Sequence, residues 1–246
     1  MKRTAIWMTA LFSAAIFLAA SRARLNTSGP GSAPEDSVAV IKRFMTASGS
    51  DGLLYQYIVT YSFRRGQKDS TASDTTSVVL CDNHNIRSNL GTMGMQVIGH
   101  GDLPGYSLIL YPENKTYALH VIDTVGGRGT YTVAKVGNET VQGYHCVHAR
   151  VTTSYGRGTG LTQDLWLSTD VPGYAMFKKM ASMQQVTPKM IAALDQAGCT
   201  GMFVKTQMQT PTFSMSMVLA SVGRKSFPGS MFQIPPGYTQ AAGRRH

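Results

Sequence analysis

Residues 138–174, NETVQGYHCVHARVTTSYGRGTGLTQDLWLSTDVPGY, carry the clearest structural pattern in this chain. Two runs rich in Val, Thr and Leu, residues 145–153 and 162–169, are separated by the glycine-rich segment SYGRGTG. Two such runs around a glycine-containing loop are typical of a β-hairpin. Gly143-Tyr144, just before the first run, predicts a bend through which a short preceding strand enters it. We expect this hairpin to lie at the centre of an antiparallel sheet.

Most of the remaining chain also has an apolar period of two, which predicts strands. In residues 53–63, LLYQYIVTYSF, one face is expected to carry Leu53, Tyr55, Tyr57, Val59, Tyr61 and Phe63. The polar segment that follows, RRGQKDSTASD, is interpreted as a turn. Shorter strands are expected at residues 76–81, 85–88, 95–98, 106–111, 116–122 and 130–136. Their spacing favours a meander, in which successive strands are neighbours.

Two later strands are predicted at residues 202–209 and 213–222. In the second of them the inward face is expected to carry Phe213, Met215, Met217 and Leu219. Residues 227–238 are interpreted as an extended segment held by prolines. The sequence therefore predicts a mainly β protein with a few helices, of the α+β class.

Three segments interrupt the strand pattern with helical signals. Ser32, Pro34 and Glu35 form a capping sequence, and apolar residues at helical spacing extend a predicted helix over residues 34–47. Thr187-Pro188 begins another helix, which Gly198 ends. Residues 174–186 have a weaker helical pattern. The ordinary role of such helices is to cover a face of the sheet.

The N-terminus has the pattern of a signal peptide. Lys2-Arg3 is a basic start, residues 6–20 are apolar or small apart from Thr9 and Ser13, and the small residues at 19–21 resemble a cleavage site. The apolar run is shorter than the ~20 residues of a membrane-spanning helix, although an N-terminal anchor remains the alternative. We expect a signal peptide at 1–21, a linker at 22–31, one domain at 32–240 and a basic tail at 241–246. The mature chain is expected in the periplasm or envelope, with no transmembrane span.

The positive charge of the chain does not indicate nucleic-acid binding. The net charge is +10, but six of the 23 Lys and Arg residues lie in the leader, beside its end or in the C-terminal tail. The other 17 are spread along the chain against 13 acidic residues, and no basic stripe alternates with aromatic residues. We therefore expect no nucleic-acid partner.

Three segments of the chain, VQGYHCVHARV, DLWLSTDVPGY and VLASVGRKSFPGSMFQIPPGYTQ, together resemble a known family. It is the family numbered four-four-one-two among domains of unknown function. The resemblance extends over residues 53–238 and is carried by Gly143, Tyr144, Cys146, Trp166, Asp170, Pro172, Phe232, Ile234, Pro235, Gly237 and Tyr238. It implies an exported envelope protein of Gram-negative bacteria. It also implies a fold similar to the lipoprotein-carrier group, a curved antiparallel half-barrel with helices against its concave side. The family carries no established activity, so no catalytic residues follow from it.

The residues themselves offer one weak catalytic or metal-binding pattern. Cys146 and His148 point to the same side of a strand and can act as nucleophile and base, or as two metal ligands. This spacing is common by chance, and no other catalytic or metal-binding motif accompanies it. We expect no enzyme activity, metal or cofactor, with an envelope hydrolase using Cys146 and His148 as the less favoured alternative.

The most informative composition feature for function is methionine. The chain has 14, of which eight lie between Met176 and Met217. A methionine-rich face either packs as ordinary core or lines a site for varied lipid tails. The first hypothesis is a binding module for a lipid or acyl chain, with ligand contacts from Tyr57, Tyr61, Trp166, Met215 and Met217. The second is a structural or protein-interaction module of the periplasm with a filled core.

The three cysteines allow two states in an oxidising compartment. Either Cys81, Cys146 and Cys199 are separate buried thiols, or one of three pairings forms a disulfide. A domain of this size does not depend on a covalent link for its stability. The sequence alone does not choose between the pairings.

Overall fold

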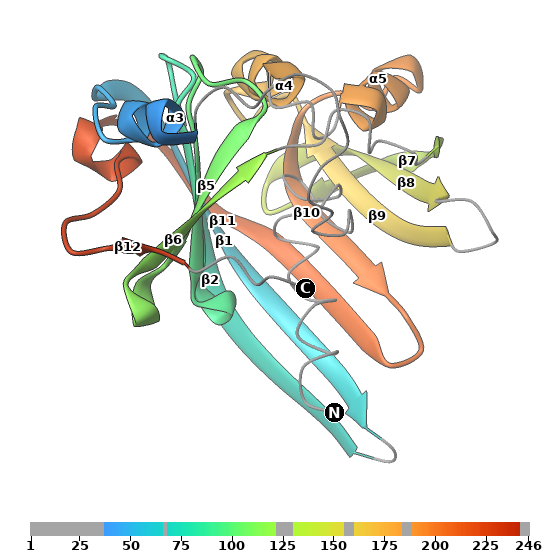
Figure 1. Cartoon of the computed structure of the whole chain (residues 1–246). Coiled ribbons are helices and arrows are strands. Elements are labelled where there is room, and N and C mark those ends of the chain that lie inside the picture. Colours follow the sequence, from blue (N-terminus) through green and yellow to red (C-terminus); the bar gives the residue numbers. More distant parts are fainter. Residues whose placement is uncertain (1–36, 66–67, 122–129, 155–159, 184–187, 242–246) are drawn as a thin grey trace.

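The computed structural model describes residues 37–65, 68–121, 130–154, 160–183 and 188–241 (Figure 1). These residues form one sheet of twelve strands in the order β12-β6-β5-β4-β3-β2-β1-β11-β10-β9-β8-β7. Neighbouring strands are antiparallel, apart from the short parallel pair β12 and β6. The strands are β1 Ser50–Arg65, β2 Lys68–Cys81, β3 Ile86–Leu90, β4 Met95–Gly99, β5 Tyr106–Tyr111, β6 Thr116–Val121, β7 Thr130–Val141, β8 Tyr144–Ser154, β9 Gly160–Ser168, β10 Met202–Gln209, β11 Phe213–Phe227 and β12 Thr239–Gln240.

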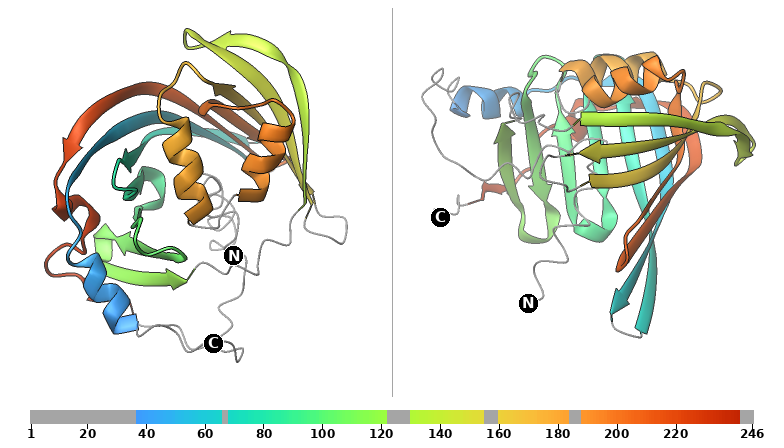
Figure 2. Two further views of the ribbon diagram at one scale, coloured as in Figure 1. Left: turned by 90° about the horizontal axis from the view of Figure 1, so that it is seen from above. Right: turned by 90° about the vertical axis from the view of Figure 1, so that its right-hand side faces the viewer.

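The helices among the described residues are α3 Ser37–Phe44, α4 Tyr174–Met183 and α5 Pro188–Gln196. Three short 3-10 turns, η1 Gly91–Met93, η2 Pro112–Asn114 and η3 Gly229–Phe232, join or follow strands. The left view of Figure 2 shows α4 and α5 inside the curve of the sheet. The sheet is open, because each described edge strand, β12 and β7, pairs with one neighbour. The predicted class, a curved antiparallel sheet with helices on its concave face, is confirmed.

The centre of the sheet is the long pair β1 and β11, not the hairpin β8–β9. The β1–β11 ladder runs from Ser50 opposite Phe227 to Phe63 opposite Phe213. The hairpin lies next to the edge strand β7, so its predicted central position is wrong. The sequence pattern identifies strands that pair locally, whereas the partner of β1 comes from the far end of the chain.

The predicted single meander is divided into two. Strands β1 to β6 form one run of successive neighbours and β7 to β11 form the other. β6 and β7 do not pair, and they lie near opposite edges of the sheet. The β1–β11 ladder therefore joins the two runs into one sheet.

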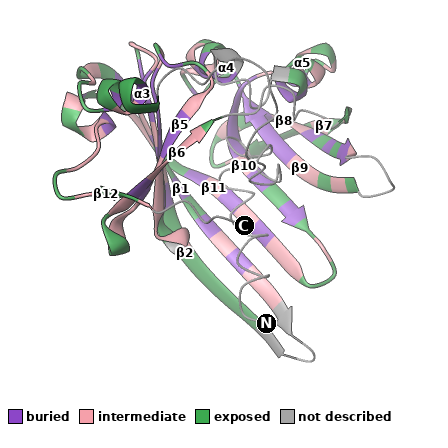
Figure 3. Ribbon diagram, in the orientation of Figure 1, coloured by how far each residue is buried: buried purple, intermediate pink, exposed green. Residues whose placement is uncertain are grey.

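The segment predicted as a polar turn is strand from Lys68 onward. Lys68–Cys81 forms β2, which pairs with β1 down to Arg65 opposite Lys68. Its polar side chains are compatible with a strand because they lie at the surface, as the exposed stretch of β2 in Figure 3 shows. Hydroxyl pairs such as Ser62 with Thr71, at 3.1 Å, add cross-strand hydrogen bonds.

The sequence predicted a bend at Gly143 and a helix end at Gly198, and the structure has both. Gln142 and Gly143 both have positive φ, 52° and 81°, and they join β7 to β8 in a tight turn of the twist-compatible type. The strand before this turn extends to Val141 and is longer than expected. The predicted end of α5 at Gly198 is confirmed, since φ is 68° there and the Cys199 N–H donates to the Leu194 carbonyl oxygen at 2.9 Å.

The sheet has an apolar core on each of its two faces. On β1, Tyr55 and the alternate residues after it belong to the larger core, which packs against α4 and α5. Leu54 points to the other face and packs against a second core. This outer core joins β2, β4, β5 and β6 to Phe44 of α3 and Phe232 of the C-terminal segment. Helix α3 therefore covers the opposite face from α4 and α5, because its buried residues belong to the outer core.

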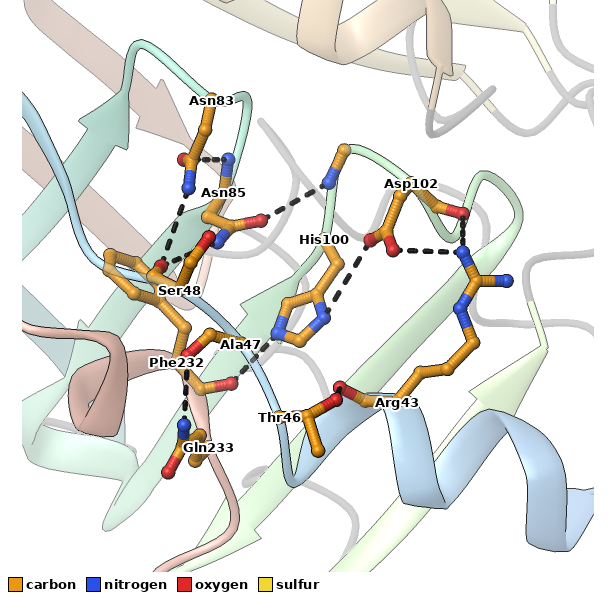
Figure 4. A network of polar contacts seen from close by, with 11 residues as sticks. Arg43, Thr46, Ala47, Ser48, Asn83, Asn85, His100, Asp102, Phe232 and Gln233 are labelled. Carbon is orange, nitrogen blue, oxygen red and sulfur yellow. Dashed lines mark hydrogen bonds and ion pairs between the residues drawn. The ribbon is translucent and has the colours of Figure 1, made fainter.

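A polar network, which we call the C-terminal clamp, fixes the chain after α3 to the segment that follows β11 (Figure 4). His100 Nε2 donates to the Phe232 carbonyl oxygen at 2.8 Å, and Gln233 Nε2 donates to the Ala47 carbonyl oxygen at 2.8 Å. Asn85 Nδ2 donates to the Ser48 carbonyl oxygen at 3.4 Å. The imidazole of His100 is 3% exposed, so its bond to Phe232 replaces lost contact with water. Residues 227–238, which the sequence predicted as an extended segment, contain the 3-10 turn η3 and are held by these hydrogen bonds.

The His100 position predicts a dependence of stability on pH. Burial lowers the pKa of His100, although the bond to Phe232 and the Asp102 carboxylate act in the opposite direction. The folded chain then binds fewer protons than the unfolded chain as the pH falls through about 6.5, the ordinary histidine value. Stability is therefore full above that pH and declines below it, by at most about 1.4 kcal/mol per pH unit for this residue. His120 contributes in the same direction, since burial lowers its pKa as well.

Urea melts between pH 8 and pH 5 measure this slope. We expect His100→Gln to have a shallower slope than the wild type. Asn85→Ala removes a neighbouring bond of the clamp but no titratable group, so it should lower stability at every pH and retain the slope. An unchanged slope in His100→Gln would contradict the assignment.

Candidate functional site

The concave face of the central strands is a continuous apolar surface. In one row across the sheet, Val59 lies opposite Met217, Met217 opposite Thr206, and Thr206 opposite Leu165. In the adjacent row, the cross-strand partners are Tyr61, Met215, Met208 and Gln163. The two rows therefore contain one aromatic ring, three flexible thioethers, two aliphatic side chains and two uncharged polar side chains. Such a surface adapts to ligands of irregular shape.

Two of the tyrosines on this face, Tyr55 and Tyr57, have their hydroxyls hydrogen-bonded within the protein. The Tyr55 hydroxyl donates to the Pro172 carbonyl oxygen at 2.7 Å, and the Tyr57 hydroxyl donates to the Phe203 carbonyl oxygen at 3.3 Å. Burial raises the pKa of both hydroxyls, so they stay neutral donors. They fix the rings without adding charge to the face.

Helices α4 and α5 cover the face and are connected to each other. Phe177 of α4 meets Phe203 edge to face, with ring centroids 5.6 Å apart. Gln163 Nε2 lies 3.7 Å from the Met190 sulfur of α5. Asp195 of α5 accepts hydrogen bonds from the Tyr174 hydroxyl and Lys178 Nζ of α4, each at 2.5 Å. The two helices thus form one cover over the sheet.

Four of the five predicted ligand residues lie together under or beside this cover. Tyr57, Tyr61, Met215 and Met217 share the concave face of β1 and β11, and each is at most 4% exposed. The fifth, Trp166, lies on the opposite face, because its strand neighbour Leu165 is the one that aligns with Thr206 and Met217. Trp166 therefore does not share the concave face with the other four residues that the sequence suggested as ligand contacts. Leu165, Trp166 and Leu167 are all apolar, so their sequence gives no alternation from which to choose the face.

Trp166 is nevertheless buried, within a cluster of charged residues on the outer face of β7 to β10. Its ring stacks on His148 at 4.3 Å between centroids, and Lys205 Nζ lies 4.2 Å from the ring centroid. The indole N–H donates to Glu139 Oε1 at 2.5 Å. Cation–π and stacking contacts of this kind add to the stability that burial provides. Trp166 thus joins four neighbouring strands from outside.

Cys146 and His148 lie on the same face of β8 but are not arranged as nucleophile and base. His148 Nε2 is 2.9 Å from Asp164 Oδ1, and His148 Nδ1 is 3.4 Å from Glu139 Oε1. The Cys146 thiol donates to the Tyr144 carbonyl oxygen at 3.4 Å, and burial raises its pKa. A protonated thiol is a weak nucleophile. Both imidazole nitrogens face carboxylates, so the pair gives no support to the hydrolase alternative.

All three cysteines are buried and none is in a disulfide. Burial raises the pKa of Cys81 to about 12, with Asp82 and Asp51 adding to the shift. Burial also raises the pKa of Cys199. Of the two states left open by the sequence, the structure has the separate buried thiols.

The family-motif residues form turns and buried anchors. Gly143 is in the β7–β8 turn, and the Pro172 carbonyl accepts the Tyr55 hydroxyl. Phe232 is fully buried in the outer core, against which Ile234 and Tyr238 also pack. In the turn that contains Pro235 and Gly237, the Tyr238 N–H donates to the Pro235 carbonyl oxygen at 3.3 Å, and Gly237 has a φ of 80°.

Asp170 closes the other end of the β8–β9 hairpin. Its Oδ2 accepts the His145 N–H at 3.1 Å and lies 3.1 Å from His145 Nδ1. The hydrogen bond from the His145 backbone lowers the pKa of the Asp170 carboxyl, with further contributions from the His145 side chain and Ser168.

Two further observations concern metals and membranes. Across the described ranges, no three His, Cys, Asp or Glu side chains are grouped to hold a metal ion. No helix in the part of the chain that the structure describes is long and apolar enough to span a bilayer.

These features define a protein with a curved, open, largely antiparallel sheet whose concave face is apolar and covered by helices. The chain belongs to the family described as Domain of unknown function (DUF4412), whose model matches residues 82–238. The family resemblance seen in the sequence is confirmed over this range, and residues 53–81 lie outside the match.

Several solved structures are similar to this chain. A LolA superfamily protein from Nitrosomonas europaea is 8% identical, with a TM-score of 0.29, 80% of this chain covered and 96% of that one. A putative outer membrane lipoprotein-sorting protein domain from Vibrio parahaemolyticus is 9% identical, with a TM-score of 0.28 and coverages of 76% and 90%. The MucA/MucB complex of Pseudomonas aeruginosa contains a chain that is 9% identical, with a TM-score of 0.31 and coverages of 74% and 55%.

At TM-scores of this size the likeness carries no inference about ligand or partner. No curated protein sequence matches the chain significantly.

The burial of Trp166 predicts the effect of removing it. Trp166→Ala leaves a cavity and removes the ring between His148 and Lys205, so we expect a loss of ~3–5 kcal/mol in the free energy of unfolding. Val136→Ala, at an exposed apolar position of strand β7, is the control and should stay within about 0.5 kcal/mol of wild type. Denaturant melts give both values. A Trp166→Ala protein as stable as the Val136→Ala control would show that the ring is not an anchor.

Proposed function

We propose that this chain is an exported envelope protein whose concave face accepts an apolar ligand, such as a lipid or acyl chain, without catalysing a reaction. One observation carries the proposal. The face beneath α4 and α5 is lined by Tyr57, Tyr61, Met208, Met215 and Met217, and its charged neighbours lie on the other face. Aromatic and methionine side chains are what an acyl chain of variable shape requires.

The cover over this face is small enough for a ligand to replace it. Its main buried side chains are Phe177, Met180, Met190, Ile191 and Leu194. At about 1.5–3 kcal/mol for each buried side chain, they contribute roughly 8–15 kcal/mol. An acyl chain with about 12 methylenes contributes roughly 10 kcal/mol at ~0.8 kcal/mol per methylene. The free energy lost when the helix side chains leave the sheet is therefore close to the free energy gained when an acyl chain takes their place.

The cover is also built to move as a unit. Asp195 connects α4 to α5 through Tyr174 and Lys178, so displacement of one helix carries the other. The side chains that the helices bury in the core on this face, such as Phe177 and Ile191, are apolar. Apolar contacts are non-directional, and an acyl chain can substitute for them.

Export is the second part of the proposal. Its support is the pattern of residues 1–21, which lie outside the described residues. The mature chain would begin near Ser21 and occur in the periplasm or envelope.

A second candidate function is a structural or protein-interaction module of the periplasm. The observation that favours it is the close burial of Tyr57, Tyr61, Met215 and Met217 with the helices in place. If the cover never moves, the concave face is an ordinary core, and only the outer surface meets a partner.

A crosslink between cover and sheet distinguishes the two candidates. Gln163→Cys/Met190→Cys joins β9 to α5 at a point where the two side chains are in contact. We expect the reduced protein to take up a fluorescent fatty acid and the oxidised protein to lose most of this uptake. The single variant Gln163→Cys should bind equally in both conditions.

Native mass spectrometry of the wild-type protein purified from its own periplasm is the complementary measurement. We expect a co-purifying lipid that organic extraction removes. Equal fatty-acid uptake by the oxidised and reduced double variant would refute the proposed displacement of the cover. Absence of both uptake and co-purifying lipid would favour the second candidate.

A further inference from the structure

The face of the sheet opposite to α4 and α5 contains a cleft that the proposed function does not use. We call it the outer cleft. Its volume is about 430 Å³, and side chains of β1 to β4, β11 and η3 line it. An apolar floor is formed by Leu54, Val79, Phe227 and Met231. Clefts of roughly 300–1,000 Å³ are the usual size of small-molecule sites.

Arg87 provides a positive charge within this cleft. It lies on β3, half-buried, with Nη1 donating to the Met231 carbonyl oxygen and Nη2 to Gln96 Oε1, each at 2.5 Å. Both acceptors are neutral, and among the described residues no carboxylate pairs with Arg87. Its two fixed bonds orient the guanidinium and leave further N–H donors for a ligand. Burial lowers the pKa of Arg87, which is consistent with a charge that lacks a compensating anion.

Lys225 places a second cation at the rim. It lies on β11 and is exposed, and its side chain makes no hydrogen bond or ion pair with another described residue. No acidic residue is among the described residues that line the cleft. The cleft therefore combines an apolar floor with two cations of which neither is neutralised.

We propose that the outer cleft binds a small amphipathic anion, a carboxylate or phosphate joined to a short apolar chain. The anionic group lies against Arg87 and Lys225, and the apolar chain covers Val79 and Phe227 on the floor. A guanidinium held by two bonds recognises carboxylate and phosphate through paired N–H donors. This ligand differs from the one proposed for the concave face in charge and in the face of the sheet that it occupies.

Methionine methyl groups report separately on the two faces. Met231 lines the outer cleft, whereas Met215 and Met217 lie on the concave face. Mature chain labelled with ¹³C at the methionine methyls is titrated with octanoate and with octyl phosphate, and Met231→Leu assigns the reporter signal. We expect at least one of the two anions to shift the Met231 signal to saturation. The anion that binds more tightly identifies the preferred group.

Compounds that lack either the charge or the apolar chain show how much each part of the ligand contributes to the affinity. Octanol lacks the anion, and acetate and inorganic phosphate lack the apolar chain, so each should bind at least about tenfold more weakly, which corresponds to ~1.4 kcal/mol. Octanol binding as tight as that of octanoate would overturn the role of the cations. Acetate or phosphate binding as tight as that of the amphiphiles would overturn the role of the floor.

Charge-removing variants test the named residues. We expect Arg87→Gln to weaken binding about tenfold or more, and Lys225→Gln to weaken it about twofold to fivefold, as for an exposed pair. Lys42→Gln removes an exposed cation on α3 and should bind as the wild type does. Lys225→Gln leaves the fold contacts of Arg87 in place, so it tests the site even if Arg87→Gln does not fold. Wild-type affinity in Lys225→Gln and folded Arg87→Gln, or shifts confined to Met215 and Met217, would contradict the proposal.

Discussion

The backbone ladder between β1 and β11 is the interaction on which the rest of this structure depends. It pairs the first strand of one meander with the last strand of the other, from Ser50 opposite Phe227 to Phe63 opposite Phe213. Without it, β1 to β6 and β7 to β11 are two separate ribbons. Because the paired residues are far apart in sequence, the ladder also carries most of the loop-closure cost of folding.

The same ladder explains how one sheet supports two cores. Successive side chains of β1 point to opposite faces, so Leu54 joins the outer core while Tyr55 joins the concave one. Helix α3 and the C-terminal clamp cover one face, and α4 and α5 cover the other. The clamp is rich in hydrogen bonds, such as that from His100 to Phe232, whereas the cover over the concave face is apolar. Polar bonds therefore hold the C-terminal segment on the outer side, whereas apolar packing holds the cover on the concave side, and the proposed binding function rests on this difference.

The sequence predicted local features well because they depend on nearby residues. The alternating run of Tyr55, Tyr57 and Tyr61 identified a strand face, and Gly198 identified the end of α5. The family resemblance was found from short motifs, since residues such as Gly143 and Phe232 have a fixed role in a turn or in the core.

Features that depend on distant pairing were not predictable in the same way. The central position of β1, the division of the meander and the strand character of residues 68–74 all follow from partners elsewhere in the chain. Trp166 was grouped with the concave-face residues as a ligand contact although it lies on the other face, because its neighbours Leu165 and Leu167 are also apolar and give no alternation. Arg87 and the outer cleft had no signal in the sequence, since the cleft forms only when β3, β11 and η3 come together.

Native-state hydrogen exchange of backbone amides tests the central role of the β1–β11 ladder most directly. Strands that hold a fold together exchange only through global unfolding, whereas edges open locally. We expect the amides of β1 and β11 to be the slowest in the chain and to share one free energy of opening, equal to that of global unfolding, with β7 and β12 faster. Slower exchange in β8 and β9 than in β1 and β11, or two separate free energies for the two meanders, would contradict this account.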